Sequence, residues 1–184
     1  MSVTSTQWFV LLLVAVGIER VVELVVSQRH LRWAFAHGGV ETGRGHYPAM
    51  VLLHVWLLVG SLVEVVFFRT AFLPWLGWPM LAGVIAAQAL RWWCIATLGR
   101  QWNTRVVVVP GATRVSSGPY RFGSHPNYVA VAVEGVCLPL VHTAWFTALT
   151  FTALNAVLMK VRIGDENQAL ALLAEPGRAA GSTT

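Results

Sequence analysis

Charged residues are scarce in this chain of 184 residues. Only 11% of the residues are Asp, Glu, Lys or Arg, against about a quarter in a typical soluble domain, and 56% are hydrophobic. So few charged side chains cannot cover the surface of a soluble domain of this length. Much of the surface must therefore face an apolar medium, which predicts an integral membrane protein.

Other features are also missing. The two cysteines, Cys94 and Cys137, lie inside apolar runs, which predicts buried packing residues and leaves no disulfide framework and no metal site. The net charge of +5 is not gathered into a basic face, so we expect no nucleic-acid partner. There is no internal repeat, and we predict a single membrane domain over residues 1–173 followed by a disordered tail over residues 174–184.

Five apolar runs predict the fold. Crossing about 30 Å of hydrocarbon takes roughly 20 helical residues. The runs cover residues 8–26, 49–68, 73–98, 128–141 and 144–159. The last two are shorter than a comfortable span and predict a hairpin packed against the other helices. The predicted fold class is all-α, an integral membrane bundle of about five transmembrane helices.

The basic residues predict the orientation of this bundle. Arg69 is the only one in the connectors on one side, whereas ten follow the first, third and fifth runs. These ten are Arg29, Arg32, Arg44, Arg100, Arg105, Arg114, Arg121, Lys160, Arg162 and Arg178. The positive-inside rule then places the N-terminus outside and the C-terminus in the cytoplasm, together with the long connector over residues 99–127. Within that connector, residues 105–109 predict a short extended piece between two Pro/Gly turns.

A dense polar and aromatic stretch, residues 117–128, directly precedes the fourth run. Pro126 fits the first turn of a helix, where its missing N–H costs nothing. A helix N-terminus beside His125 predicts a site for a carboxylate or phosphate. The alternative is a helix entry in an interfacial aromatic belt.

Polar residues inside the last two runs are further candidates. Glu134 follows Asn127 by seven residues and shares its helix face, which favours a functional role, the alternative being a structural ion pair with Arg91 or Arg20. The last run carries one stripe that extends toward the cytoplasmic end, made of Asn155, Met159, Arg162 and Glu166. Its alternative explanation is a snorkelling arginine in an ordinary helical Arg-Glu pair.

Several short motifs follow one another between about Arg91 and Leu172. They are Leu98-Gly99-Arg100, Trp102-Asn103-Thr104-Arg105, Pro110-Gly111, Gly118-Pro119-Tyr120-Arg121, His125-Pro126-Asn127-Tyr128, and Arg162-Ile163 with Glu166. In this order they resemble the isoprenylcysteine carboxyl methyltransferase family and its small bacterial relatives, which include alkylpyrone and alkylresorcinol O-methyltransferases. The glycine-rich dinucleotide fingerprint is absent, which excludes only the soluble Rossmann type of methyltransferase.

The resemblance implies a membrane enzyme that binds S-adenosylmethionine in a cytoplasmic pocket formed by the C-terminal half, residues 91–172. A lipophilic substrate would enter from the bilayer. The implied cofactor-binding residues are Tyr120, His125, Pro126, Tyr128, Arg162 and Glu166. Ser124 and Asn167 depart from the family pattern, where relatives often have Arg and Glu, and these departures question an isoprenylcysteine carboxylate as the acceptor.

The acceptor group and a rival function stay open. A carboxylate acceptor needs only orientation by an arginine, whereas a hydroxyl of a polyketide lipid gains from a base, which favours Glu134, with Arg162 and Asn155, as the catalytic residues. The rival is a small non-enzymatic transporter, in which buried charges such as Glu19, Glu23, Glu64, Arg91 and Glu134 form an ion route. The sequence leaves the oligomeric state open.

Overall fold

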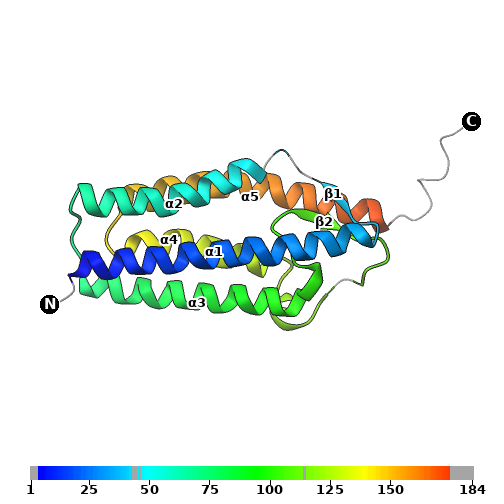
Figure 1. The fold of residues 1–184 in the computed structure, drawn as a ribbon, viewed down its shortest axis with the longest axis horizontal. Coiled ribbons are helices and arrows are strands. Elements are labelled where there is room, and N and C mark those ends of the chain that lie inside the picture. Colours follow the sequence, from blue (N-terminus) through cyan, green and yellow to red (C-terminus); the bar gives the residue numbers. More distant parts are fainter. Residues whose placement is uncertain (1–3, 43–44, 46, 114, 175–184) are drawn as a thin grey trace, which may run out of the picture.

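The structure is a computed structural model that describes residues 4–42, 45, 47–113 and 115–174, without the side chains of residues 167–174. Its helices are α1 (Ser5–Ala36), α2 (Tyr47–Phe67), α3 (Pro74–Leu98), α4 (Pro126–Leu140) and α5 (Trp145–Ala174). They lie side by side in one elongated bundle (Figure 1). All five apolar runs are therefore helical. Of the predicted tail only Ala174 is described, and Arg44, Arg114 and Arg178 also lie outside the described residues.

Three helical segments are long and apolar enough to cross a membrane: Tyr47–Phe67, Pro74–Gln101 and Trp145–Glu166. Helix α4, at 15 residues, is short as predicted, but α5 has 30 residues and the expectation of a short last helix was wrong. Helix α1 has 32 residues and holds Glu19, Arg20 and Glu23 near its middle. Large apolar side chains point outward along the bundle, as a lipid-facing surface requires. The protein is thus an integral membrane protein.

Helix α4 occupies the centre of the bundle, packed between α3 and α5, while α2 packs on α5 and α1 on α2. Gly135 allows the close approach of α4 to α5, because the ring of Phe151 fills the space that a Cβ would need. Phe151 and Leu138 are fully buried there. The α3–α4–α5 core is therefore tightly packed.

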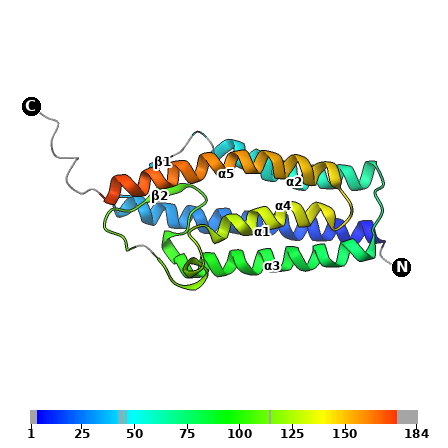
Figure 2. The same ribbon diagram turned by 180° about the vertical axis from the view of Figure 1, so that it is seen from behind.

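One end of the bundle brings together the first turn of α1, the α2–α3 connection and the α4–α5 turn (Figure 2). Thr70 Oγ1 donates to the His142 carbonyl (2.7 Å) and Thr143 Oγ1 to the Ala71 carbonyl (2.7 Å). These bonds satisfy the polar groups of the turn that joins α4 to α5. Arg69 lies at this end, beside Thr70, as the basic-residue pattern requires.

The other end holds a small two-stranded sheet, which the all-α prediction did not include and which adds to a mostly helical fold. Strand β1 (Val40–Thr42) pairs antiparallel with β2 (Val106–Val108). The extended piece predicted at residues 105–109 is confirmed by β2, but its partner strand was not predicted. Two 3-10 turns, η2 (Gly99–Gln101) and η3 (Gly118–Arg121), complete this end. The longer α1 and α5 also reach it, so Arg29 and Arg32 lie in a helix and not in a connector.

Candidate active site

A pocket, here called the β2 pocket, lies where β2, η3, α4 and α5 meet. It encloses about 1280 Å³ of empty space including its open mouth. The part of this space that water can enter is about 230 Å³, somewhat below the roughly 300–1,000 Å³ of typical pockets for small molecules and cofactors, and it opens to solvent at the mouth. Its polar lining side chains include Arg105, Tyr120, His125, Tyr128, Arg162 and Glu166.

Four of the residues expected to bind a cofactor contact one another in this pocket. The Tyr128 hydroxyl donates to Glu166 Oε2 (2.5 Å) and accepts from Arg162 Nε (2.9 Å). The His125 ring stacks on the Tyr128 ring, with centroids 5.2 Å apart and planes 9° apart, and its Nδ1 lies 3.7 Å from Glu166 Oε2. The pocket therefore presents cationic and anionic groups side by side.

Tyr120 also lines the β2 pocket, whereas Pro126 does not. Burial raises the pKa of the Tyr120 phenol far above its usual value, so this side chain is neutral and serves as a flat apolar surface with one hydroxyl. Pro126 is the first residue of α4 and follows His125, which occupies the N-cap position. Its role in the structure is to start the helix and thereby aim His125 and Tyr128.

A second cavity, here called the α2 chamber, lies deeper in the bundle and has about 890 Å³ of empty space including its open side, of which water can enter about 170 Å³. Most of its exposed wall is apolar, and α2 contributes Met50, Val51, Val55 and Leu58 to it. Charged side chains line it as well: Arg20 and Glu23 from α1, Arg91 from α3 and Arg162 from α5. The chamber thus combines a lipophilic wall with a charged lining, which suits an amphiphilic ligand.

The two cavities share one wall, made of Trp102, Asn103, Asn127, Tyr128 and Arg162. Three polar atoms of this wall are buried without a hydrogen-bond partner in the described part of the chain: Trp102 Nε1, Asn103 Oδ1 and Asn127 Oδ1. Buried polar groups in proteins are nearly always satisfied. The wall therefore has one donor and two acceptors that no described residue uses.

Helix α1 holds half of this wall in place. Ser27 Oγ accepts from the Thr104 backbone N–H (2.9 Å) and contacts Thr104 Oγ1 (2.8 Å). The His30 Nδ1 donates to the Trp102 carbonyl (2.8 Å). The segment that follows η2 is therefore fixed by side chains far from it in sequence.

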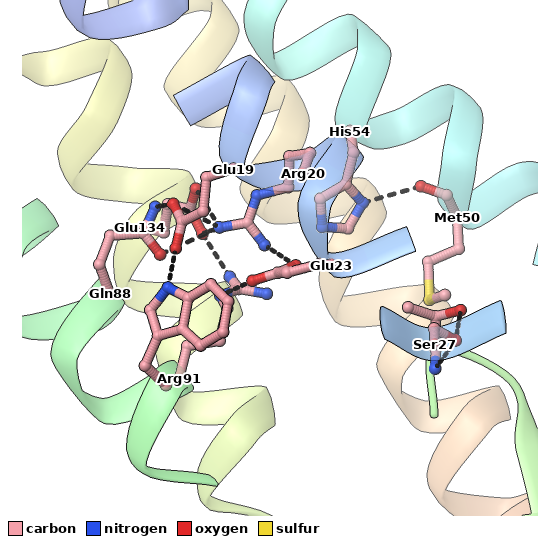
Figure 3. Close-up of polar contacts among 11 residues, drawn as sticks. Glu19, Arg20, Glu23, Ser27, Met50, His54, Gln88, Arg91 and Glu134 are labelled. Carbon is pink, nitrogen blue, oxygen red and sulfur yellow. Dashed lines mark hydrogen bonds and ion pairs between the residues drawn. The ribbon is translucent and has the colours of Figure 1, made fainter. Parts of the chain in front are cut away.

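Charged side chains from α1, α3 and α4 form a buried cluster beside the α2 chamber (Figure 3). Glu134 is 2% exposed and accepts hydrogen bonds from Arg91 Nη2 and, at 3.1 Å to both of its oxygens, from Arg20 Nη2. Arg20 Nη1 also donates to Glu23 Oε2 (2.5 Å). Glu134 lines neither cavity. Its position matches the ion-pair alternative, with both predicted arginines as partners.

The stripe on α5 divides between the two cavities. Met159 lines the α2 chamber, Glu166 lines the β2 pocket, and Arg162 lines both. Asn155, one turn deeper, lines neither, although it is buried and its Oδ1 has no partner among the described residues. Of the three residues expected to be catalytic, only Arg162 reaches a cavity.

The sequence did not predict the residues that α1 and α2 contribute to the two cavities and their shared wall. Ser27 and His30 fix the shared wall, while Met50 and His54 line the α2 chamber. The available signal was the presence of ionisable residues inside apolar runs, which the sequence shows at Arg20, Glu23 and His54. No described group of three or more His, Cys, Asp or Glu side chains forms a metal site.

Comparison with known proteins identifies the family. Residues 80–172 match the isoprenylcysteine carboxyl methyltransferase (ICMT) family, a stretch that includes α4, most of α5 and most residues of the β2 pocket. The chain belongs to this family. It is therefore a membrane methyltransferase, and the resemblance drawn from the motifs is confirmed.

Two relatives match nearly the whole chain. The Bacillus subtilis protein YpbQ is 35% identical over 163 residues, which is 88% of this chain and 96% of that relative. A Haemophilus influenzae protein is 26% identical over 157 residues, which is 84% of this chain and 90% of that relative. Neither name states an activity. No solved structure matches this chain significantly.

Proposed function

We propose that this protein is an S-adenosylmethionine-dependent O-methyltransferase that acts on a lipophilic acceptor, an alkylpyrone- or alkylresorcinol-type hydroxyl or a prenylcysteine-like carboxylate. The observation that supports it best is the shared wall between a polar pocket and an apolar chamber. A methyltransferase for lipids needs a site for a polar cofactor and a site for an apolar acceptor that meet at one point.

The β2 pocket has the chemistry that the cofactor requires. Arg162 and His125 are suited to its carboxylate, Glu166 to its ribose hydroxyls, and the rings of Tyr120 and Tyr128 to its adenine. The unpartnered Asn103 and Asn127 oxygens are acceptors available for its ammonium group. Bound there, S-adenosylmethionine supplies a methyl group on a positively charged sulfur.

The chain's own residues then orient and enclose the reactants. Methyl transfer gains most of its rate from holding the acceptor oxygen in line with the methyl group in a site closed to water. The α2 chamber accommodates the lipid chain, while Arg20 and Arg91 position the oxygens of its polar end. Glu134, bonded to both guanidinium groups, keeps them in place.

The orientation is part of the proposal. The positive-inside rule puts the end with β1 and β2 in the cytoplasm, where the cofactor is made, and the end with Thr70 and His142 outside. The buried charges do not favour the transporter alternative, because Arg20, Glu23, Arg91 and Glu134 bond to one another.

The decisive experiment uses purified protein in lipid nanodiscs with radiolabelled S-adenosylmethionine. It tests an alkylresorcinol, an alkylpyrone and a prenylcysteine as separate acceptors, and identifies the labelled product by mass spectrometry. We expect cofactor binding that Arg162→Ala weakens and labelling of one acceptor class. Absence of cofactor binding by the wild-type protein would refute the proposal.

A further inference from the structure

We infer that His54 is the general base of this enzyme and that its acceptor therefore has an O–H proton, as a phenol or an enol does, and is not a carboxylate. This inference rests on the proposed function and goes beyond it, because it selects one acceptor class and assigns the proton to one atom. His54 lies on α2 and lines the α2 chamber.

The local geometry fixes the protonation pattern of the His54 ring. Its Nδ1 lies 2.8 Å from the Met50 carbonyl oxygen (Figure 3), and a carbonyl can only accept. Nδ1 therefore has the hydrogen, and in the neutral ring Nε2 has the lone pair. The ring packs edge-on against Phe151, with centroids 5.8 Å apart and planes 88° apart, so its orientation is set.

The other chamber residues that titrate are less suited to take a proton. Glu23 is the main rival, because it lines the chamber and its Oε1 has no hydrogen bond within the described chain. However, it is ion-paired to Arg20 (2.5 Å) and Arg91 (3.5 Å), and protonation would leave both guanidinium groups less well neutralised. Glu134 has the same two partners and does not reach the chamber. Protonation of a neutral imidazole breaks no ion pair.

The surrounding donors fit an acceptor with a second oxygen. Arg20 and Arg91 line the chamber, and their buried Nε atoms have no hydrogen-bond partner among the described residues, although Arg91 Nε lies 3.5 Å from Glu23 Oε1. They can hold a neighbouring carbonyl or hydroxyl oxygen, such as those of a resorcinol or a hydroxypyrone, while Nε2 of His54 faces the reacting O–H. Met50 links this arrangement to the shared wall, because its Sδ accepts from Arg162 Nη1 (2.7 Å).

The proton balance of the reaction is simple. The acceptor oxygen forms a bond to the methyl carbon as the sulfur–carbon bond breaks, the positively charged sulfur becomes a neutral thioether, and the O–H proton moves to Nε2 of His54. The resulting imidazolium releases this proton to water after the product leaves. A carboxylate acceptor has no proton to lose and would not need His54.

The test compares His54→Asn with a matched control, His37→Asn. Asparagine can still donate to the Met50 carbonyl but has no basic nitrogen. His37 makes the same local bond, from its Nδ1 to the Trp33 carbonyl at 2.8 Å, but is exposed and lines neither cavity. We expect His54→Asn to lower turnover of an alkylresorcinol by about a hundredfold or more, with cofactor affinity unchanged, and His37→Asn to behave as wild type.

A pH profile separates a base from a structural residue. The charged and titratable groups around the chamber are Arg20, Glu23, Tyr47, Arg91, Tyr128 and Arg162. Without the base, the reaction needs an acceptor that is already ionised, so the rate of His54→Asn should rise by about tenfold per pH unit toward the pKa of a phenol, near 10. The rate of the wild-type enzyme should stop rising with pH once the pH is high enough for its His54 imidazole to be neutral.

Three results would overturn the inference while leaving the proposed function intact. The wild-type enzyme could methylate only the prenylcysteine carboxylate, or His54→Asn could turn over alkylresorcinol normally. In the third, the tenfold rise in rate per pH unit that marks a missing base would appear in Glu23→Gln and not in His54→Asn. Binding of alkylresorcinol, measured by calorimetry without cofactor, should remain in His54→Asn. Loss of binding would assign the residue to packing and would also overturn the inference. Failure of the proposed function differs from all of these, because wild type would then not bind the cofactor.

Discussion

Replacing Glu134 with glutamine tests whether the buried charged cluster is a structural ion-pair network. The substitution keeps the size of the side chain but removes its charge. Glu134 accepts from Arg20 and Arg91 and is buried, and breaking such a pair from one side costs about 3–5 kcal/mol, since the partner charge stays buried. At about 2–4 °C per kcal/mol for a chain of this length, we expect the melting temperature to fall by about 6–20 °C.

The assay measures melting temperature, cofactor affinity and turnover on one preparation of Glu134→Gln in nanodiscs. We expect cofactor affinity close to wild type, because Glu134, Arg20 and Arg91 do not line the β2 pocket, and a modest loss of turnover through displaced arginines. The matched control is Glu64→Gln, because Glu64 accepts from the backbone N–H groups of Phe146 (3.0 Å) and Thr147 (2.8 Å). Weakening these two bonds should cost about 1 kcal/mol of stability and lower the melting temperature by about 2–4 °C.

One outcome would refute this reasoning. If Glu134→Gln melts at the wild-type temperature and turnover still falls by about a hundredfold or more, Glu134 acts as a general base and the cluster is catalytic. The original expectation from the sequence would then hold, and the positioning role drawn from the geometry would be wrong.

Three further predictions follow from the fold and the β2 pocket. His125→Ala and Arg162→Ala should each weaken binding of S-adenosylmethionine by about ten- to a hundredfold, because each removes one contact that contributes about 1.5–3 kcal/mol of binding free energy. The exposed control Arg121→Ala should bind normally in the same calorimetric titration. Reporter fusions after Arg44, Arg121 and Ser182 should report the cytoplasm and a fusion after Thr70 the opposite side, and any reversed signal contradicts the orientation. Gly135→Ala should destabilise the α4–α5 contact by about 1–3 kcal/mol in thermal unfolding, while Gly164→Ala, where nothing lies within 4 Å of the added Cβ, should not.

The helices were predictable because a bilayer imposes a minimum length and an apolar composition on each of them. Their ends were less predictable. Helix α1 continues to Ala36 and α5 to Ala174, beyond the apolar runs, because a helix that leaves the membrane can be polar and then has no hydropathy signal. The β1–β2 pairing was half predicted, since Val106–Val108 is an unbroken β-branched run, whereas Val40–Thr42, of the same length, is interrupted by Glu41.

The candidate site was predictable where its residues lie close together in sequence. His125 and Tyr128 belong to one motif, and Arg162 and Glu166 lie one turn apart on one helix. The shared wall was not predictable, because Thr104 depends on Ser27, which is 77 residues away. Neither hydropathy nor residue spacing indicates contacts between residues so far apart in sequence. For the same reason the sequence did not predict that His54 lines the α2 chamber.

The pairing of Arg20 with Glu134 also sets an order of assembly for the protein in the cell. These two residues are 114 positions apart, so α1 leaves the ribosome long before its partner on α4 is synthesised. A charge near the centre of a membrane helix costs about 2.5–3.5 kcal/mol during insertion, and the pair of Arg20 with Glu23 within α1 offsets only part of it. We therefore expect α1 to settle in the bilayer only after α3 and α4 have arrived. A chain truncated before Glu134 would expose α1 to the quality-control proteases of the membrane, so the C-terminal half decides whether the N-terminal helix survives.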